Sequence, residues 1–456
     1  MADSYDCIVI GSGPGGYVAA IRAAQLGMKT AVVERDLVGG RCLNYACIPA
    51  KAVLRVADIL SEIDEAAAFG IDVPSRTVDF ARVGERRRKV ITTLTGGVSS
   101  LFKKNAVDYV EGEGSLAGGR RVRVGDRELE ASTCVVLATG SVPLPIPGTQ
   151  FGGRVIGTED AWAFDALPGS LAVVGAGASG AEIASAYARL GTRVSLFEAV
   201  DRVLPLEDAD ISKAAGRVLA KQNIELHTGT LVRDVRTGDA SVTFTHGDTP
   251  AEADWLVIAA GRRPDVEALG LDAAGVAVGE RGLIEVEGRM RTSVDGVYAI
   301  GDLVPGPALA HKASDEGVVA VEDAAGLDTH PIAYVDIPRA TFCTPNVSSF
   351  GLTEDQARDA GYDVVIGKVQ YGAVGAGAVY GDRQGVIKIV GETRYGELLG
   401  GHIVGAKATE LIQELVNVRA LEGGFAEVAR IVHGHPTLAE GVMEAARAAD
   451  GWLIHG

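Results

Sequence analysis

Uninterrupted apolar runs alternate with helix-like segments at the start of the chain. Residues 7–10 form a short apolar run of the kind that builds a buried parallel strand. Residues 17–26 read as a helix that Gly27 ends, and residues 30–33 read as a second strand. Strand, helix and strand in this order predict a βαβ unit of an α/β protein.

The same order of elements returns in the middle of the chain. Residues 171–174 read as a strand, 181–190 as a helix and 193–197 as a second strand. The repeated pattern predicts a second domain of the same class. The length of 456 residues allows about three domains, because domains run roughly 100–200 residues each.

The last part of the chain has a different pattern. Pro338, Pro345 and a glycine-rich run at 372–381 interrupt it. Residues 386–390 alternate like a strand, and residues 408–421 read as an amphipathic helix. This mixture predicts an α+β domain.

A glycine-rich loop joins strand to helix in each βαβ unit. The loops read G-x-G-x-x-G and contain Gly11, Gly13, Gly16, Gly175, Gly177 and Gly180. In such a loop the first glycine makes the tight turn, the second lets a pyrophosphate approach the backbone, and the third lets helix and strand pack closely. The helix N-terminus adds N–H groups and a positive dipole. The loops predict two dinucleotide sites in two Rossmann-like domains, with a purely structural, empty loop as the alternative.

An acidic residue follows the second strand of each unit. Glu34 and Glu198 stand where a carboxylate can accept hydrogen bonds from ribose hydroxyls. A carboxylate at Glu198 would also repel a 2′-phosphate, which favours NAD over NADP. Arg202 lies nearby in sequence and leaves NADP open.

Two cysteines, Cys42 and Cys47, follow the first loop. A dithiol near a bound dinucleotide can pass two electrons between sulfur and a cofactor ring. On a regular helix, residues five apart are separated by more than a full turn, so a bridge between these two needs a distorted turn. We expect Pro49 to interrupt the helical hydrogen bonds just beyond the pair.

Composition narrows the classes of partner and compartment. A formal net charge of -17 makes nucleic acid and membrane surfaces poor candidates, although acidity also simply favours solubility. The chain has five cysteines, a sparse and odd number that argues against a secreted disulfide scaffold. Cys7 and Cys134 lie in apolar runs and read as core residues. We expect no signal peptide and no transmembrane helix, because no basic start or long uncharged apolar stretch is present.

The motifs in this order are similar to those of the pyridine nucleotide-disulfide oxidoreductases, and most closely to the dihydrolipoamide dehydrogenase branch of that family. The resemblance spans nearly the whole chain. The two glycine loops stand at the family's spacing around the cysteine pair. Further matching motifs lie at residues 138–141, 260–264, 309–313 and 433–440. Residues 297–302 resemble the family's second flavin motif, whose acid, here Asp302, is expected to bind the ribityl chain.

The resemblance implies FAD and NAD as cofactors and no metal. By this comparison Lys51 and Glu182 form an ion pair beside the flavin N5. Gly261 belongs with the cofactor-binding residues at the exit of the NAD domain. The other residues expected at the flavin or its adenine end are Gly114, Thr139, Gly140, Ser141, Asp302, Leu309, Ala310 and His311.

The resemblance also implies the reaction. His435, held by Glu440, would take a proton from a dihydrolipoamide thiol, and the thiolate would attack Cys42. Cys47 would then pass electrons to FAD, which reduces NAD. His433 is the less favoured candidate for the base. In this family the base comes from the other subunit, so a homodimer is expected.

The expected organisation has four segments. They are an FAD-binding domain at 1–145, an NAD-binding domain at 146–268, a central segment at 269–336 that returns to the FAD domain, and a C-terminal dimerisation domain at 337–456. The implied partner is the lipoyl-bearing acyltransferase of a 2-oxo acid dehydrogenase complex or the lipoyl protein of glycine cleavage. The expected location is cytoplasmic.

Rival functions remain within and beyond the family. Glutathione or mycothiol disulfide reductases share the dithiol and the histidine, whereas the C-terminal end lacks the cysteine pair of mercuric reductases. Soluble transhydrogenases lack one of the two cysteines. A non-catalytic flavoprotein is the alternative from another class. Arg41, where the family has a small or hydroxylated residue, is expected either to lower the pKa of Cys42 or to face solvent or phosphate.

Overall fold

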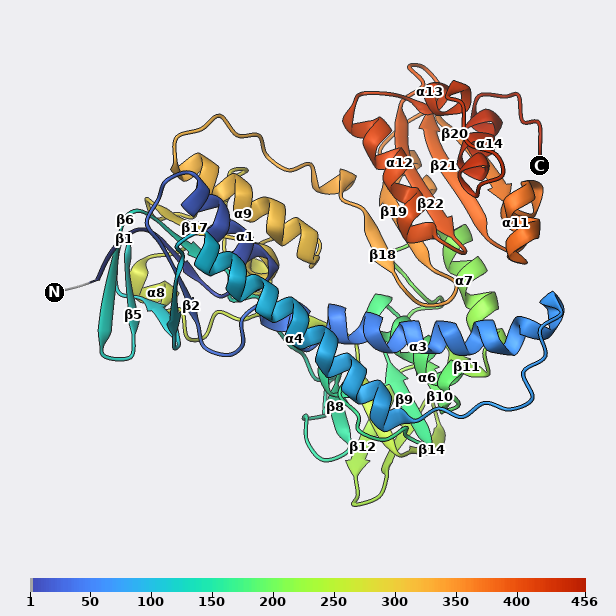
Figure 1. Cartoon of the computed structure of the whole chain (residues 1–456), viewed down its shortest axis with the longest axis horizontal. Helices are drawn as coiled ribbons and strands as arrows, with labels where there is room; N and C mark the ends of the chain where they lie inside the picture. The colour runs from blue at the N-terminus through green and yellow to red at the C-terminus, as the bar shows by residue number, and fades with distance from the viewer. Residues whose placement is uncertain (1–2) are drawn as a thin grey trace. The chain divides into compact units, whose positions relative to one another are not determined.

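The structure is a computed structural model that describes residues 3–456, and the chain divides into two units (Figure 1). Unit 1 comprises Met1–Ala52, Ala81–Leu144 and Gly261–Tyr334. Unit 2 comprises Val53–Phe80, Pro145–Ala260 and Val335–Gly456. Each unit therefore combines segments that are far apart in the sequence.

Unit 1 is built on a seven-stranded sheet with the order β3-β2-β1-β6-β5-β4, in which β17 also pairs with β6. Strands β1, β2, β3, β6 and β17 pair in parallel, and β4 and β5 form an antiparallel extension. The strand bounds are β1 (Asp3–Ile10), β2 (Thr30–Glu34), β3 (Asp108–Glu111), β4 (Gly114–Leu116), β5 (Arg121–Val124), β6 (Arg127–Leu137) and β17 (Val297–Ala299).

Two helices, α1 (Pro14–Gln25) and α9 (Ala310–Ala324), pack against each other beside this sheet (Figure 1). The central strands are apolar on both faces because they are covered on both sides. Cys7 and Cys134 are neighbours across β1 and β6 and are fully buried, which confirms them as core residues. The smaller elements of unit 1 are α2 (Gly40–Asn44), the antiparallel pair β7 (Ser141–Pro143) and β16 (Arg262–Pro264), and α8 (Leu271–Ala274).

Unit 2 contains a five-stranded parallel sheet with the order β11-β10-β9-β15-β8. Its strands are β8 (Val155–Gly157), β9 (Ser170–Val174), β10 (Arg193–Phe197), β11 (Ile224–His227) and β15 (Trp255–Ile258). A small antiparallel sheet is formed by β12 (Val232–Thr237), β13 (Val242–His246) and β14 (Thr249–Ala253). The helices of this part are α5 (Thr158–Ala161), α6 (Ala178–Leu190) and α7 (Ala209–Lys221).

The C-terminal part of unit 2 is an antiparallel sheet with helices, as its α+β pattern predicts. The sheet has the order β18-β19-β22-β21-β20, and α14 packs on β20 and β21. The strands are β18 (Arg339–Thr341), β19 (Val347–Gly351), β20 (Val364–Gln370), β21 (Val386–Glu392) and β22 (Leu398–Val404). The helices are α10 (Glu354–Asp359), α11 (Gly375–Tyr380), α12 (Ala408–Ala420), α13 (Phe425–Arg430) and α14 (Ala439–Ala449).

Two helices run from one unit into the other along the chain, α3 (Cys47–Glu65) and α4 (Phe80–Lys104). The strands and helices predicted around both glycine loops are confirmed, with α1 and α6 each beginning three residues earlier than expected. The helix predicted at 408–421 is α12. None of the helices within residues 3–456 is both long and apolar enough to cross a bilayer.

Candidate redox and dinucleotide-binding site

The first glycine loop has the close contacts that its sequence predicts. Gly11 has a φ of +102°, and a Cβ there would lie 2.4 Å from the carbonyl oxygen of Ala138. A Cβ on Gly16 would lie 1.9 Å from the carbonyl oxygen of Gly11. By contrast, apart from Gly13 itself and its neighbours along the chain, no described residue comes within 4 Å of a Cβ placed on Gly13. The space beside Gly13 is therefore a cradle that a side chain would fill and a pyrophosphate can enter.

The second loop repeats this geometry in unit 2. Gly175 has a φ of +100°, and its Cβ would lie 2.6 Å from the carbonyl oxygen of Ala259. A Cβ on Gly180 would lie 1.8 Å from the carbonyl oxygen of Gly175, whereas the space at Gly177 is open to 4 Å among residues 3–456. Both loops fit a dinucleotide pyrophosphate at the N-terminus of a helix.

Each loop is tied to the acid at the end of the neighbouring strand. Glu34 is buried and accepts hydrogen bonds from the backbone N–H and the hydroxyl of Ser12, at 2.8 and 2.7 Å. Glu198 accepts from the backbone N–H of Ala176 at 2.7 Å and of Val200 at 3.1 Å. A carboxylate has about four acceptor positions, so each acid keeps capacity for ribose hydroxyls.

Several residues expected at the flavin lie together in unit 1. The Ser141 hydroxyl donates to Asp302, and Arg262 donates through Nε to the same hydroxyl at 2.8 Å. The Thr139 hydroxyl donates to the carbonyl of Asp265 at 2.6 Å, and the N–H of Asp265 donates to the carbonyl of Gly140 at 2.9 Å. These contacts bring the strand-end turn at 139–141 to the second predicted flavin motif.

The remaining expected residues occupy turns and helix ends. A Cβ on Gly114 would lie 3.0 Å from Cγ2 of Ile10, so β4 packs closely over the sheet. Leu309 is the N-cap of α9, with Ala310 and His311 in its first turn. Gly261 has a φ of +148°, and its carbonyl accepts from the N–H of Leu144 at 3.1 Å. Lys51 belongs to unit 1 and Glu182 to unit 2, where Glu182 is buried and accepts from the N–H of Phe342 at 2.9 Å.

The segment that leads into the cysteine pair lies directly on the first glycine loop. A Cβ on Gly40 would lie 2.7 Å from Cα of Gly13, and the N–H of Gly39 donates to the Ser12 hydroxyl at 3.2 Å. Gly40 begins α2, which carries Cys42, so this contact fixes the position of that helix against the loop. The segment that carries Cys42 therefore begins at the edge of the cradle.

The two cysteines belong to different helices. Cys42 lies in α2, Cys47 begins α3, and both are half-buried thiols. Tyr45 ends α2 outside helical geometry, with a φ of -129° and a ψ of -20°. This break is the distorted turn that the spacing requires. The expectation for Pro49 was wrong, because Pro49 lies in the first turn of α3, where a missing N–H costs no helical hydrogen bond.

The thiols are coupled. The hydrogen bond with Cys47 is the largest cause that raises the pKa of Cys42, followed by burial and by repulsion from a Cys47 thiolate. The charges of Lys51 and Arg41 act in the opposite direction and are outweighed. The pair therefore supports one thiolate at a time. The expectation that Arg41 lowers the pKa of Cys42 is right in sign, but this effect is smaller than the effects that raise the pKa.

The predicted acid–base pair is present in unit 2. His435 Nδ1 lies 2.9 Å from Oε1 of Glu440, and the N–H of Thr437 donates to Oε2 of the same carboxylate at 2.9 Å. Burial acts to raise the pKa of Glu440, but the hydrogen bonds from His435 and Thr437 outweigh it and lower this pKa. The His435 side chain is 76% exposed, so its other ring nitrogen is open to a substrate.

His433 forms a second histidine–carboxylate pair that the sequence did not reveal. Its Nε2 lies 2.6 Å from Oε1 of Glu414 on α12, and its Nδ1 donates to the carbonyl of Ile431 at 2.8 Å. The side chain is 5% exposed. With both ring nitrogens engaged, His433 is poorly suited to take a proton from substrate. Sequence reasoning also missed Ser12, whose hydroxyl joins Glu34 to Gly39.

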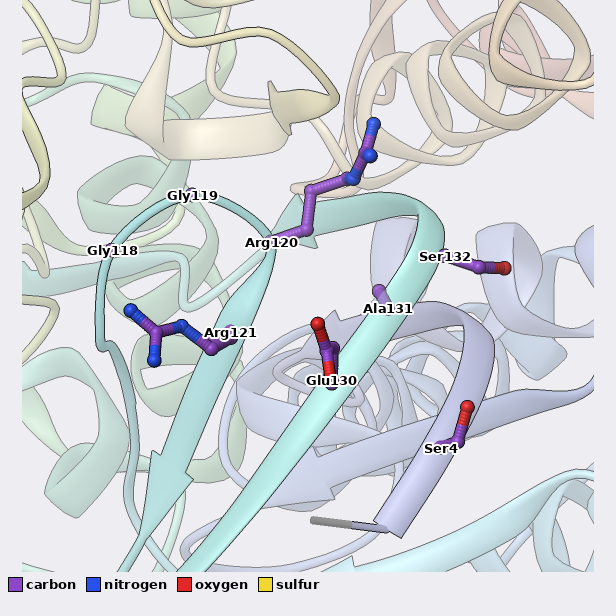
Figure 2. A pocket seen from close by; sticks show the side chains of 8 residues that line it. All are labelled: Ser4, Gly118, Gly119, Arg120, Arg121, Glu130, Ala131 and Ser132. Atoms are coloured by element: carbon purple, nitrogen blue, oxygen red, sulfur yellow. The ribbon is translucent and has the colours of Figure 1, made fainter.

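A cavity elsewhere in unit 1 contains none of the predicted site residues (Figure 2). It has a volume of about 570 Å³ and lies where the turn before β5 faces β6 and the start of β1. The residues that line it are Ser4, Gly118, Gly119, Arg120, Arg121, Glu130, Ala131 and Ser132. The site described above therefore lies outside this cavity. It consists of the open cradle at the first glycine loop and the His435–Glu440 pair.

Comparison with known proteins identifies the family. A family model described as pyridine nucleotide-disulphide oxidoreductase matches residues 5–317. The model of that family's dimerisation domain matches residues 337–446. The chain belongs to this family. Pyridine nucleotide-disulphide oxidoreductases depend on FAD and bind NAD(P), and the open cradles at Gly13 and Gly177 fit both groups.

Two curated full-length relatives share one name. A protein of Rhizobium etli named dihydrolipoyl dehydrogenase is 40% identical, and the match covers 100% of both chains. A protein of the same name from Mycobacterium tuberculosis is 41% identical, with 99% of each chain covered. Among solved structures, LpdA from Mycobacterium tuberculosis has a TM-score of 0.90 at 27% identity and covers 97% of this chain and 99% of its own. A copper complex of the flavoprotein disulfide reductase RclA from Escherichia coli has a TM-score of 0.87 at 26% identity, with 97% and 99% covered.

Proposed function

We propose that this chain is a dihydrolipoyl dehydrogenase, which oxidises protein-bound dihydrolipoamide to lipoamide and reduces NAD⁺ to NADH. The observation that carries the proposal is the contact of Gly40 with Gly13, since it joins the dithiol segment to the first dinucleotide loop. The names of the full-length relatives agree with this activity. When bound, FAD supplies the two-electron relay between the thiol pair and NAD⁺.

The protein's own residues account for the sulfur chemistry. His435, oriented by Glu440, takes the proton of one substrate thiol. The resulting thiolate attacks Sγ of Cys42 in the oxidised pair, so a mixed disulfide forms and Cys47 leaves as a thiolate. The second substrate sulfur then attacks the mixed disulfide and releases Cys42. Lipoamide leaves, and its two electrons remain on the cysteine pair.

The cofactor preference follows from Glu198. Its carboxylate is held at the second loop by Ala176 and Val200, where it can accept from both ribose hydroxyls and repel a 2′-phosphate. Arg202, the residue that left NADP open, donates to the carbonyl of Pro205 at 3.2 Å. We therefore propose NAD as the nicotinamide cofactor.

The assignment of parts follows the same comparison. FAD is proposed to bind residues 1–145 with the returning segment 269–336, and NAD to bind residues 146–268. Lys51 and Glu182 are proposed to pair beside the flavin. The residues proposed as catalytic are Cys42, Cys47, His435 and Glu440.

The biological setting is proposed as well. The match to a dimerisation domain supports a homodimer, in which His435 of one subunit serves the cysteine pair of the other. The proposed partners are the lipoyl-bearing acyltransferase of a 2-oxo acid dehydrogenase complex or the glycine cleavage lipoyl protein. The sparse cysteines favour a reducing compartment, for which we propose the cytoplasm.

A turnover assay tests the proposal. The purified protein should be yellow and should oxidise NADH with lipoamide far faster than with glutathione disulfide or mycothiol disulfide. NADPH should be a poor donor. Cys42→Ser should abolish lipoamide turnover, and His435→Gln should lower it by roughly 100-fold or more. A preference for a low-molecular-weight disulfide would instead assign a reductase of the glutathione or mycothiol type.

A further inference from the structure

A buried ion pair lies at the start of helix α9. Lys312 Nζ is 3.1 Å from Oε1 of Glu316, and both side chains are 0% exposed. Lysine and glutamate are almost never fully buried unless each has a partner, because both charges lose their hydration. The sulfur chemistry uses neither residue, so the pair calls for another explanation.

The pair holds one residue, Gly301, through its backbone N–H and its carbonyl. Lys312 Nζ donates to the carbonyl of Gly301 at 2.9 Å, and the N–H of Gly301 donates to Oε2 of Glu316 at 2.7 Å. Gly301 has a φ of +72°, and its Cβ would lie 3.3 Å from Cβ of Ala313 on the same helix. Both polar groups of this residue are thus fixed by α9.

Tyr334 completes the cluster. Its hydroxyl donates to Oε1 of Glu316, and its ring centroid lies 5.3 Å from Lys312 Nζ. Burial raises the pKa of Glu316, against the effects of Lys312, Tyr334 and the Gly301 N–H. The carboxylate therefore depends on all three partners to remain charged.

The next residue in the chain is Asp302, the acid expected to bind the ribityl chain. Its side chain accepts from Ser141, which is itself held by Arg262. Asp302 is thus fixed through its own carboxylate on one side and through the preceding peptide on the other. A carboxylate that hydrogen-bonds a cofactor hydroxyl must be held within about half an ångström, so the support of its backbone affects affinity.

We propose that Lys312, Glu316 and Tyr334 are positioning residues that hold Gly301, and through it the adjoining Asp302, in place for the flavin. The cluster sets how tightly FAD is bound without touching the reacting sulfur or nicotinamide. This inference rests on the proposed role of Asp302 in FAD binding.

The same helix offers a matched control. Near its other end Asp323 accepts from the hydroxyl of Tyr298 at 2.8 Å and from Nε of Arg291 at 2.6 Å. Asp323 is likewise a buried carboxylate on α9 that is bound by the cation of Arg291 and by one tyrosine, and Arg289 lies 3.7 Å from its Oδ1. Within residues 3–456 Asp323 makes no hydrogen bond with Gly301. Glu316→Gln and Tyr334→Phe can therefore be compared with Asp323→Asn and Tyr298→Phe.

The readout is FAD affinity, measured by titrating flavin-stripped protein with FAD, together with the temperatures of flavin release and of global unfolding. Glu316→Gln should raise the dissociation constant of FAD by about tenfold or more, and Tyr334→Phe by a smaller factor. For the control variants, the dissociation constant of FAD should stay within about twofold of the parent value, even where their unfolding temperature falls as far as that of Glu316→Gln or Tyr334→Phe. Equal FAD affinity in the two pairs at matched stability would overturn the inference. Should Glu316→Gln not fold, Tyr334→Phe against Tyr298→Phe decides alone.

Asp302→Ala separates this inference from the proposed function. If the parent protein binds no FAD, the proposed function itself fails. If Asp302→Ala weakens FAD binding while Glu316→Gln and Tyr334→Phe do not, only the positioning role fails. An Asp302→Ala variant with parental affinity overturns the inference at its base.

Discussion

Glu198 accepts a 2.7 Å hydrogen bond from the backbone N–H of Ala176, the residue between the first two glycines of its loop. In the first loop Glu34 accepts in the same way from the N–H of Ser12 at 2.8 Å. Each acid thus does two tasks, because it closes the loop against the neighbouring strand and keeps lone pairs for a ribose. The two loops share this design although residues 11 and 175 begin them in different units.

Replacing Glu198 should therefore weaken nicotinamide binding without affecting the flavin. Glu198→Gln replaces a charged hydrogen-bond acceptor by a neutral one. A hydrogen bond to a charged group contributes about 1.5–3 kcal/mol. The KM for NADH should rise by about tenfold or more, with FAD content unchanged. The matched variant Glu34→Gln should instead lose FAD. An unchanged KM for NADH in Glu198→Gln would show that this acid does not contact the cofactor.

Local pattern was sufficient to predict the strand, helix and strand around each glycine loop, and also β21 and α12, because these depend on residues close together in sequence. The Glu34 and Glu198 positions follow from the same pattern. The Glu414–His433 pair and the burial of Lys388 could not be predicted in this way. Lys388 alternates with apolar neighbours in β21 as a solvent-facing residue would, and only carboxylates from residues 208, 210 and 354 make its burial favourable.

The thiol pair predicts a change in alkylation. Cys47 is the largest cause of the raised pKa of Cys42, through its hydrogen bond and its charge. In reduced protein, Cys47→Ala should therefore lower the pKa of Cys42, and alkylation of Cys42 by iodoacetamide should begin at lower pH than in the parent. Mass spectrometry of the Cys42 peptide across a pH series measures this. Arg41→Thr serves as the comparison and should move the profile slightly in the opposite direction, since the Arg41 charge lowers this pKa.

The His433–Glu414 pair predicts a stability difference that depends on pH. The hydrogen bond that His433 donates to Glu414 is the largest cause that raises the pKa of His433. A raised folded-state pKa gives stability that is fully present below the unfolded value and is lost as pH rises through the folded value. His433→Gln should thus cost roughly 1 kcal/mol of unfolding free energy at about pH 6 and less at about pH 9. Urea unfolding at both pH values measures the difference, and a cost that grows with pH would contradict the pairing.

The buried Lys388 predicts the largest loss of stability. Its side chain is 2% exposed, and its Nζ lies 2.9 Å from Asp208, 3.0 Å from Asp210 and 2.8 Å from Glu354. Lys388→Met would leave these carboxylates without their shared cation, so we expect a loss of about 3–5 kcal/mol in unfolding free energy.

Lys368 provides the control for Lys388, because it binds the same Asp210 at 2.9 Å with a side chain that is 43% exposed. Solvent screens that pair, so Lys368→Met should cost about 1 kcal/mol or less. Urea unfolding of the two variants beside the parent measures both values. Equal losses of unfolding free energy would mean that removing any partner of Asp210 has the same cost. A large loss confined to Lys388→Met would show that the cost comes from the buried charge cluster that joins α7, α10 and β21 within unit 2.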